Sequence, residues 1–525
     1  MKRFRFDFAA RIFFIALVLR LVPVILSFNL GIGLDDMFQY DMLARSMVAG
    51  TGYRWYSEPD LYLVKPFINF DLTSVNYDPR GVLTSFRPPL YPAFLALIYF
   101  VTGVGAKRFF IARLVQAFLG ACLAPLTYLL AKKLAHPSRC IDPGEAGKGG
   151  EFGEKTARLA AWIVTAYPML VIYPLSLATE NLFFLLILGS ILALLKAEET
   201  TVNANSANVQ MARTGTGNEK GSRSSSIRVF LFSSRWFIFA GVLLGLAALT
   251  RSVAQAFAIL AVLWIWFALR QRKMALVTFA AIAVVILPWI VRNSLLYHRL
   301  TGIETALGYD VYVSYHPQSS GTFQYPQSLD LLPILDDMKR EEIGLAKTRA
   351  FILSDPARVP YLMVRRLGYF FGLERRAITY FYSNNFFGYI PPAGLFAISA
   401  VMLLPFMLIS SSAALGLTLV RNRPATWLIG LLFLGYISPH ILIIAEDRFH
   451  LTLIPFLAIF AAACWSGGKS ALRERVRTPT GKLVLALAVL AILLLFLNWG
   501  LELWRDSDKL IQLFGPIGNE TYFPY

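Results

Sequence analysis

Charged residues are scarce in this 525-residue chain: Asp, Glu, Lys and Arg make up 16% of it, against 56% hydrophobic residues. A soluble globular domain carries nearer a quarter of charged residues, so the composition excludes a single soluble globule. Cysteine is scarcer still. Cys122, Cys140 and Cys464 fall in predicted spans or an inner loop, and they offer neither a disulfide framework nor a C-x-x-C zinc site.

Several familiar motifs are missing as well. The chain has no G-x-x-x-x-G-K-[ST], no G-x-G-x-x-G after a strand, no H-E-x-x-H and no G-x-S-x-G, so neither a soluble nucleotide nor a serine nucleophile is indicated. The net charge of +18 comes from bases in short loops between apolar runs, which form no helical face or aromatic platform. Nucleic acid is therefore not an expected partner.

Long apolar runs are abundant. About eleven of them approach the roughly 20 residues that a helix needs to cross a bilayer. Lipid offers no hydrogen bonds to open backbone, and the runs lack the alternation of barrel strands, so each predicts a helix. The runs cover residues 12–30, 111–134, 159–175, 182–195, 236–249, 253–269, 274–291, 393–420, 427–445, 451–465 and 483–499. The predicted fold class is an all-α polytopic membrane protein with about 11 transmembrane helices (11–13).

The distribution of bases predicts the topology. Four bases precede the first run, which we interpret as an uncleaved anchor with a cytoplasmic N-terminus. Inner segments then collect about half of the Lys and Arg but few of the acids, provided that Pro88–Gly103 is an interfacial or re-entrant helix and not a crossing. The expected units are a module 1–300 with an outer loop 31–108 and inner loops 136–157 and 197–235, an extracytoplasmic loop region 301–391, C-terminal spans 392–499 and an extracytoplasmic tail 500–525. The inner loops contain Gly-, Ser- and Asn-rich stretches that we interpret as disordered linkers.

Three aspartates follow the first run, in "GLDDMFQYDMLARSMVAGTGYRW". Asp36 and Tyr40 share one face of a predicted amphipathic helix, while Asp41 and Arg45 can pair at i, i+4 on its solvent side. Either Asp35 or Asp36 can be the N-cap. The other is then free to accept a proton from a substrate hydroxyl.

Further polar residues lie on the same predicted face. Arg87 precedes "PPLYP", where it is either an interfacial anchor or a phosphate ligand. Glu180 begins a helix after Thr179, where an acid either complements the helix dipole or takes part in a site. The remaining outer-face clusters are "LPWIVRN" with Arg292 and Asn293, "AEDRFH" with Arg448, and "ALGYDVYVSYHP" with Tyr309, Tyr312 and His316. Interface anchoring explains each cluster alone, but their convergence on one face favours a site for a phosphate-headed amphiphile.

In order along the chain, "DDMFQYDMLARSMVAGTGY", "RPPLYPAFLALIYFVTG", "ATENLFF" and "LPWIVRN" resemble motifs of membrane glycosyltransferases. The family concerned is that of dolichyl-phosphate-mannose protein O-mannosyltransferases and lipid A aminoarabinose transferases, glycosyltransferase family 39. The resemblance runs from Arg11 to about Pro317, and more loosely to Phe460. It implies a GT-C glycosyltransferase fold with two large extracytoplasmic loops.

The resemblance also implies roles for individual residues. Asp36, four residues before Tyr40, corresponds to the catalytic acid, with Asp35 and Glu180 as further catalytic candidates. Arg87, Arg292 and Arg448 are the expected donor-phosphate ligands. The expected substrate-lining residues are Tyr40, Tyr91, Asn293, Tyr309, Tyr312 and His316. No metal ligands are assigned, although a divalent metal is possible because some relatives use one.

The implied reaction moves a sugar, with inversion, from a polyprenyl-phosphate donor to a hydroxyl of a protein, lipid A or another glycan. The expected place is the bacterial inner membrane, within the cell envelope, with the site and the C-terminus extracytoplasmic and membrane lipids as partners. Two alternatives stay open. One is a transporter or flippase of lipid-linked sugars, which predicts inverted repeats; the other is a non-catalytic polysaccharide assembly protein.

Overall fold

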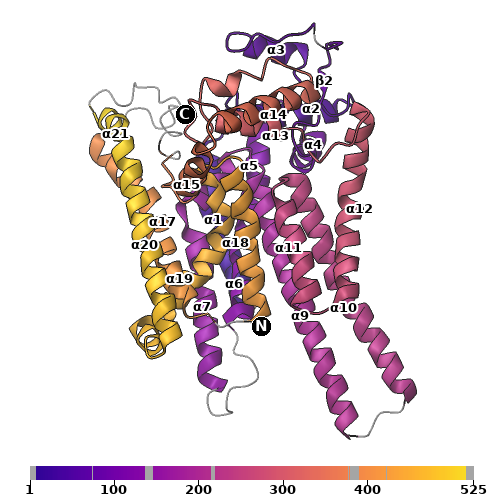
Figure 1. Cartoon of the computed structure of the whole chain (residues 1–525), viewed down its shortest axis with the longest axis vertical. Coiled ribbons are helices and arrows are strands. Elements are labelled where there is room, and N and C mark those ends of the chain that lie inside the picture. The colour runs from indigo at the N-terminus through magenta and orange to yellow at the C-terminus, as the bar shows by residue number, and fades with distance from the viewer. Residues whose placement is uncertain are drawn as a thin grey trace, which may run out of the picture.

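A computed structural model describes residues 7–73, 75–135, 146–214, 219–375, 378, 390–420 and 423–515. Helices account for nearly all regular structure in these residues, and one two-stranded ribbon pairs β1 (Arg54–Trp55) antiparallel with β2 (Val82–Leu83). Long helices stand side by side, and shorter elements cap one end of the bundle (Figure 1).

Eight helices of the described residues are long and apolar enough to cross a membrane. They are α1 (Phe8–Leu26), α5 with α6 (Arg108–Ala121 and Leu123–Ala135), α9 (Glu180–Thr214), α12 (Arg272–Tyr297), α17 (Pro392–Leu417), α18 (Pro424–Leu442), η3 with α19 (Asp447–Leu453 and Ile454–Arg475) and α20 (Pro479–Arg505). A pair bent by 57°, α7 (Ala146–Ala166) with α8 (Pro168–Ile172) and η1 (Tyr173–Leu175), is a further candidate span. The apolar end of α10 (Glu219–Thr250) and α11 (Ala254–Phe267) account for the remaining predicted runs.

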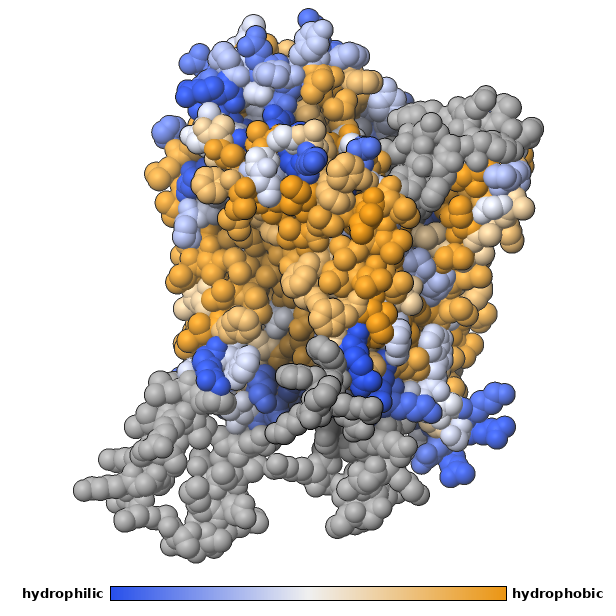
Figure 2. Space-filling model, turned by 180° about the vertical axis from the view of Figure 1, so that it is seen from behind, coloured by the Kyte–Doolittle hydropathy of each residue, from blue (hydrophilic) through white to orange (hydrophobic). Residues whose placement is uncertain are grey.

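The surface agrees with a membrane setting. On the face seen in Figure 2, a broad hydrophobic belt covers the middle of the bundle, and hydrophilic residues gather at its two ends. On α20 the side chains of Leu483, Leu493 and Leu494 are each more than half exposed. Apolar surface on this scale suits contact with lipid and not with water. The predicted all-α polytopic membrane protein is confirmed.

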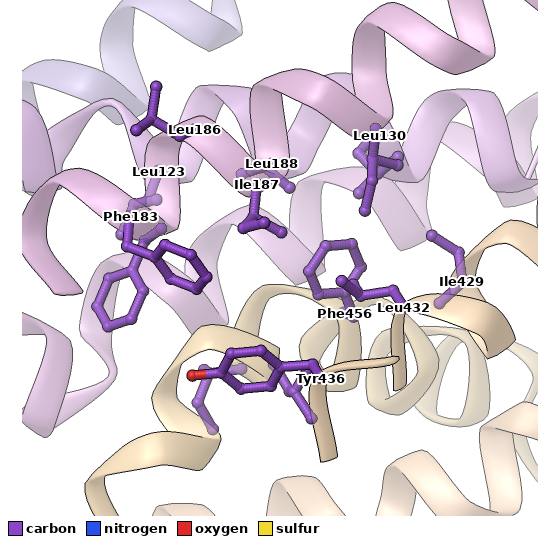
Figure 3. Close-up of a cluster of buried hydrophobic side chains, with 14 of the residues drawn as sticks. Leu123, Leu130, Phe183, Leu186, Ile187, Leu188, Ile429, Leu432, Tyr436 and Phe456 are labelled. Atoms are coloured by element: carbon purple, nitrogen blue, oxygen red, sulfur yellow. The ribbon is translucent and has the colours of Figure 1, made fainter. Parts of the chain in front are cut away.

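The core of the bundle joins early and late helices. Phe183, Ile187 and Leu188 of α9 face Tyr436 and Leu432 of α18, and Phe456 of α19 fills the space between them (Figure 3). The C-terminal spans are therefore packed into the N-terminal module and do not form a separate body.

Arg20 of α1 lies in this apolar setting with no exposed surface. Its guanidinium donates to the carbonyls of Ala16, Val164 and Thr165, at 3.1 to 3.4 Å. The arginine is thus paired within the bundle, because carbonyl oxygens replace the water that it would otherwise need.

Two outer segments form the cap. Its first half holds α2 (Asp36–Val48), α3 (Glu58–Val64), the ribbon and α4 (Leu90–Thr102), and its second half holds α13 (Leu307–Tyr315), η2 (Gln327–Leu329), α14 (Asp337–Ser354) and α15 (Arg358–Phe370). Phe38, Trp55 and Phe86 share one hydrophobic core with Tyr309 and Leu335. The two predicted loops are therefore one packed layer.

The helix α4 behaves as an interfacial helix. Its 13 residues span about 20 Å, which is too short for the hydrocarbon core of about 30 Å. It packs beside α2 within the cap (Figure 1), where the rings of Tyr40 and Tyr91 meet edge to face at 5.1 Å.

The structure corrects two predictions. Asp41 does not face solvent: its side chain is 1% exposed, and it accepts from Arg45 and Arg108, both at 2.8 Å, and from Tyr99 at 3.1 Å. The inner linkers are helical where they are described, because α7 begins at Ala146 and α9 continues to Thr214. Residues 136–145 and 215–218 lie outside the described residues.

Close packing of α17 on α19 leads to a first prediction. A Cβ atom on Gly416 would lie 1.8 Å from the carbonyl oxygen of Phe460, whereas a Cβ on Gly430 of α18 would meet nothing within 4 Å. We expect Gly416→Ala to destabilise the protein by about 1–3 kcal/mol, because the two helices must separate. Thermal unfolding of the detergent-solubilised protein measures this. Gly430→Ala is the matched control, and an equal melting temperature for both variants would contradict the close packing.

Candidate functional site

The site begins at the N-terminus of α2. Asp35 is the N-cap, because its carboxylate accepts the backbone N–H of Met37 at 2.9 Å. This confirms one of the two predicted caps. Asp36 is the first helical residue, and its side chain is left to make contacts outside the helix.

Asp36 lies between two arginines. One carboxylate oxygen accepts from Nη2 of Arg87, and the other accepts from Nη2 of Arg448 at 3.1 Å. Arg87 also donates to Gln39 at 2.8 Å, and Arg448 donates to Glu446 at 2.8 Å. The Asp36, Arg87 and Arg448 side chains are 33%, 20% and 32% exposed, so the cluster can be reached from outside.

The charges of this cluster set the protonation state of Asp36. Burial raises the pKa of Asp36, but the nearby guanidinium groups of Arg87 and Arg448 outweigh it and lower the pKa to about 2. Burial lowers the pKa of Arg87, but the negative charge of Asp36 outweighs it and raises that pKa above its usual value. Asp36 is thus a carboxylate, and both arginines are cations, throughout the neutral range.

A second ion pair lies next to the first. Glu180 begins α9 and is 2% exposed, and its Oε1 lies 2.5 Å from Nη1 of Arg251. The Arg251 guanidinium also lies 4.9 Å from the centre of the Phe449 ring. Phe449 is the residue that follows Arg448 in the chain. The predicted residues Asp36, Arg87, Arg448 and Glu180 therefore belong to one neighbourhood.

The predicted aromatic residues divide into three places. Tyr40 lies under Arg87, with 5.7 Å from the guanidinium to the ring centre. Tyr91 is buried behind it and donates to Gln116 at 2.6 Å. Tyr309 packs against Phe86 at 5.5 Å, next to Arg87 in the chain.

The other predicted residues make their contacts elsewhere in the cap. Tyr312 donates to Asp330 at 2.7 Å, and its ring meets His316 at 5.6 Å. Arg292 donates to the carbonyl of Thr84 at 2.7 Å. Asn293 is fully buried and donates to the carbonyls of Gly302 and Ile303 at 2.9 and 3.1 Å. These contacts hold the cap together, and the predicted donor and substrate roles of these residues stay predictions.

Sequence reasoning missed three residues near the arginines. Arg251 follows the end of α10, where a lone base on the outer side was the available signal. Glu304 accepts from Ser252, and Asp310 lies in the first turn of α13. Burial raises the pKa of Asp310 to about 8, and the negative charges of Glu304 and Asp36 add to this while Arg87 opposes it. Neither acid differs in sequence from an ordinary loop acid.

The described parts of the chain contain no group of three or more His, Cys, Asp or Glu side chains placed to hold a metal ion. Metal dependence therefore stays a sequence-based expectation, and none of the site chemistry below uses a metal.

No family model matches the chain. The search of curated proteins found no match to it either. Among solved structures, the chain is similar to the apo oligosaccharyltransferase of Archaeoglobus fulgidus, with 14% identity, a TM-score of 0.47 and coverage of 100% of this chain and 61% of that one. The oligosaccharyltransferase AglB of the same organism, in complex with an inhibitory peptide and a dolichol-phosphate, is 14% identical with a TM-score of 0.43. That match covers 97% of this chain and 60% of AglB. ArnT from Cupriavidus metallidurans, bound to undecaprenyl phosphate, is 13% identical with a TM-score of 0.35. That match covers 89% of this chain and 79% of ArnT.

The chain thus spans about three fifths of the length of the two oligosaccharyltransferases.

A buried carboxylate fixes the segment that carries Arg87. Asp337 of α14 accepts from the hydroxyl of Thr84, the N–H of Ser85 and the hydroxyl of Tyr297, each at 2.7 Å, and it also pairs with Arg340. The second half of the cap therefore holds the backbone two residues before Arg87.

This clamp gives a second prediction. Asp337→Ala leaves the buried Arg340 cation and several donors without an acceptor, so we expect a loss of about 3–5 kcal/mol of stability. Chemical unfolding followed by tryptophan fluorescence measures it. The control is Glu342→Gln, also on α14, which breaks an exposed pair with Arg299 and should change stability by less than about 1 kcal/mol. Equal effects of the two variants would contradict the clamp.

Proposed function

We propose that this protein is a membrane glycosyltransferase that moves a sugar from a polyprenyl-phosphate donor to an acceptor hydroxyl at the capped face of the bundle. The observation that supports it most is the position of Asp36 between Arg87 and Arg448, at the boundary of the cap and the apolar spans. Two guanidinium groups are suited to a phosphate, and the adjoining belt suits a lipid tail. The motif resemblance of the sequence favours the same class.

The proposed step is a direct displacement. The acceptor oxygen attacks the anomeric carbon and forms the new glycosidic bond, while the bond from that carbon to the phosphate oxygen breaks. The electron pair remains on the leaving lipid phosphate, which Arg87 and Arg448 stabilise. Asp36 takes the proton of the acceptor hydroxyl, and attack from the face opposite the phosphate inverts the anomeric centre.

The ion pairs of Asp36 couple donor binding to base strength. Arg87 and Arg448 hold the pKa of Asp36 near 2, which makes the carboxylate a weak proton acceptor. A donor phosphate competes with Asp36 for the same two arginines. When it takes them, the pKa of Asp36 rises towards its ordinary value of about 3.9, and the base becomes stronger only after the donor is bound.

The neighbouring pair of Glu180 and Arg251 supports this exchange. Arg251 lies over Phe449, so it borders Arg448 without pairing with Asp36 in the described contacts. We assign Glu180 a supporting role, in which it keeps Arg251 in place beside the site. The proposed setting is the bacterial inner membrane with the cap extracytoplasmic, and the acceptor is a protein, lipid A or another glycan.

The central prediction concerns the two adjacent aspartates. Asp36→Asn should lower transfer by about 10²–10⁴-fold at normal protein abundance, because the amide cannot take the proton. Asp35→Asn should keep most of the activity, since asparagine is an equally good N-cap. Mass spectrometry of lipid-linked sugars and surface glycans, in a deletion strain carrying each variant, measures both.

Loss of transfer in Asp35→Asn alone would move the base to Asp35. Full activity of both variants would overturn the proposed mechanism, and a lipid-linked sugar that changes sides without transfer would favour the flippase alternative.

The pH dependence gives a fourth prediction. A general base must be deprotonated, so kcat/KM falls as the pH drops through the pKa of Asp36 in the free enzyme. With that pKa near 2, the wild-type profile should show no acidic limb from Asp36 above pH 4. Arg87→Gln removes one lowering charge, so the limb should move to higher pH as well as lowering the rate. Arg292→Gln should leave the limb where it is, and a limb that moves equally in both variants would contradict the coupling.

A further inference from the structure

The far edge of the bundle has a second, separate arginine cluster where α15 meets α20. Asn498 donates to the carbonyl of Gly368 at 2.9 Å, and Trp499 donates to the carbonyl of Phe371 at 2.9 Å. A Cβ atom on Gly368 would lie 2.5 Å from Asn498, so the two helices touch through the glycine. The junction is a fixed part of the fold.

Two arginines at this junction share one tyrosine. Arg365 donates to the hydroxyls of Tyr361 at 2.8 Å and Tyr369 at 2.5 Å. The guanidinium of Arg365 lies 5.3 Å from the Tyr369 ring centre, and that of Arg505 lies 5.8 Å from the same centre. Two cations are thereby held close to one ring.

Neither of these cations has a carboxylate within ion-pair distance among the residues that the structure describes. The nearby acids Glu502 and Asp506 pair instead with Arg375, at 2.7 and 2.6 Å. The Nε atom of Arg365 is buried and has no hydrogen-bond partner. Arg365 therefore keeps an unused donor, while Arg505 donates from Nε to the carbonyl of Leu501 at 3.1 Å, and neither cation is in an ion pair among the described residues.

The surroundings of the cluster are those of a membrane interface. Val364 and Leu367 on α15, and Leu497, Leu501 and Trp504 on α20, are all exposed. Figure 1 places α20 at the edge of the bundle, with its C-terminal end at the capped face. A stretch of exposed leucines with tryptophan and tyrosine at its end is typical of the level where lipid tails meet head groups.

We propose that Arg365 and Arg505 bind the phosphate of an anionic phospholipid, whose tails lie along the exposed leucines of α20. Guanidinium groups form charge-assisted, often bidentate, hydrogen bonds with phosphate oxygens, which would use the free donor of Arg365. This lipid is distinct from the sugar donor, because the arginines assigned to the donor are paired with Asp36 in another cluster. The site fixes α15, which packs on η3 and so on the segment of Arg448.

Native mass spectrometry of the full-length protein tests the proposal. The purified protein is incubated with phosphatidylglycerol or with phosphatidylcholine, and the retained lipid is counted. The wild type should retain phosphatidylglycerol preferentially. Arg365→Gln with Arg505→Gln should weaken retention roughly 25-fold, at about fivefold for each arginine. Arg365→Lys with Arg505→Lys keeps the charge but not the bidentate geometry, so it should retain more phosphatidylglycerol than the glutamine variant and less than the wild type, which separates lost binding from misfolding.

The matched control removes two charges from the cap. Lys339→Gln with Arg349→Gln, both exposed on α14, should leave phosphatidylglycerol retention unchanged. Equal retention by the wild type and the double glutamine variant would overturn the proposal, and so would an equal loss in the control. Displacement of the bound lipid by added polyprenyl phosphate would also overturn it, because the site would then belong to the donor. Sugar transfer by the glutamine variant, measured separately, reports on the proposed function and not on this site.

Discussion

The pairing of Asp36 with Arg87 and Arg448 is the interaction on which the rest of the site depends. These three residues come from the first cap helix, the segment after the ribbon and the start of the penultimate span. Each pair is only moderately buried, so each contributes little to stability by itself. Its value is geometric: a carboxylate held by two cations keeps three remote segments in one arrangement and keeps the arginines oriented towards a common point.

The surrounding structure makes that arrangement possible at several levels. Asp35 caps α2 and leaves Asp36 free, and Asp337 fixes the backbone before Arg87. The Tyr40 ring lies close to the Arg87 guanidinium, and the Phe449 ring lies close to the guanidinium groups of both Arg448 and Arg251. Charged groups at a lipid boundary need such fixed partners, because water cannot reorganise around them as it does on an exposed surface. The site is therefore built from pairs that are already satisfied before any ligand arrives.

The sequence predicted the parts of this structure that depend on local pattern. The apolar runs predicted the spans because length and hydropathy suffice for a helix in lipid, and "LDD" before a periodic segment limited the cap to Asp35 or Asp36. Asp41 was misplaced because its partners Arg108 and Tyr99 are distant in sequence, so nothing local indicated its burial. Arg251, Glu304 and Asp310 were missed for the same reason: their importance comes from the packing of α10 and α13 beside Arg87. Charge rules predicted a face of the membrane, and only tertiary contacts distinguished the members of that face.

The shared core of the cap has a consequence for how the chain is made. Phe86 and Trp55 can pack against each other early, but they gain Tyr309 and Leu335 as core partners only after those residues have been synthesised. Asp36 gains its second arginine only when residue 448 follows. During synthesis from the N-terminus, Asp36 therefore has Arg87 as its only arginine partner until Arg448, which lies 412 residues after Asp36, is added. The charge arrangement of the site cannot exist in any shortened chain that ends before η3, so a prematurely released chain would carry the motifs of the site without its geometry.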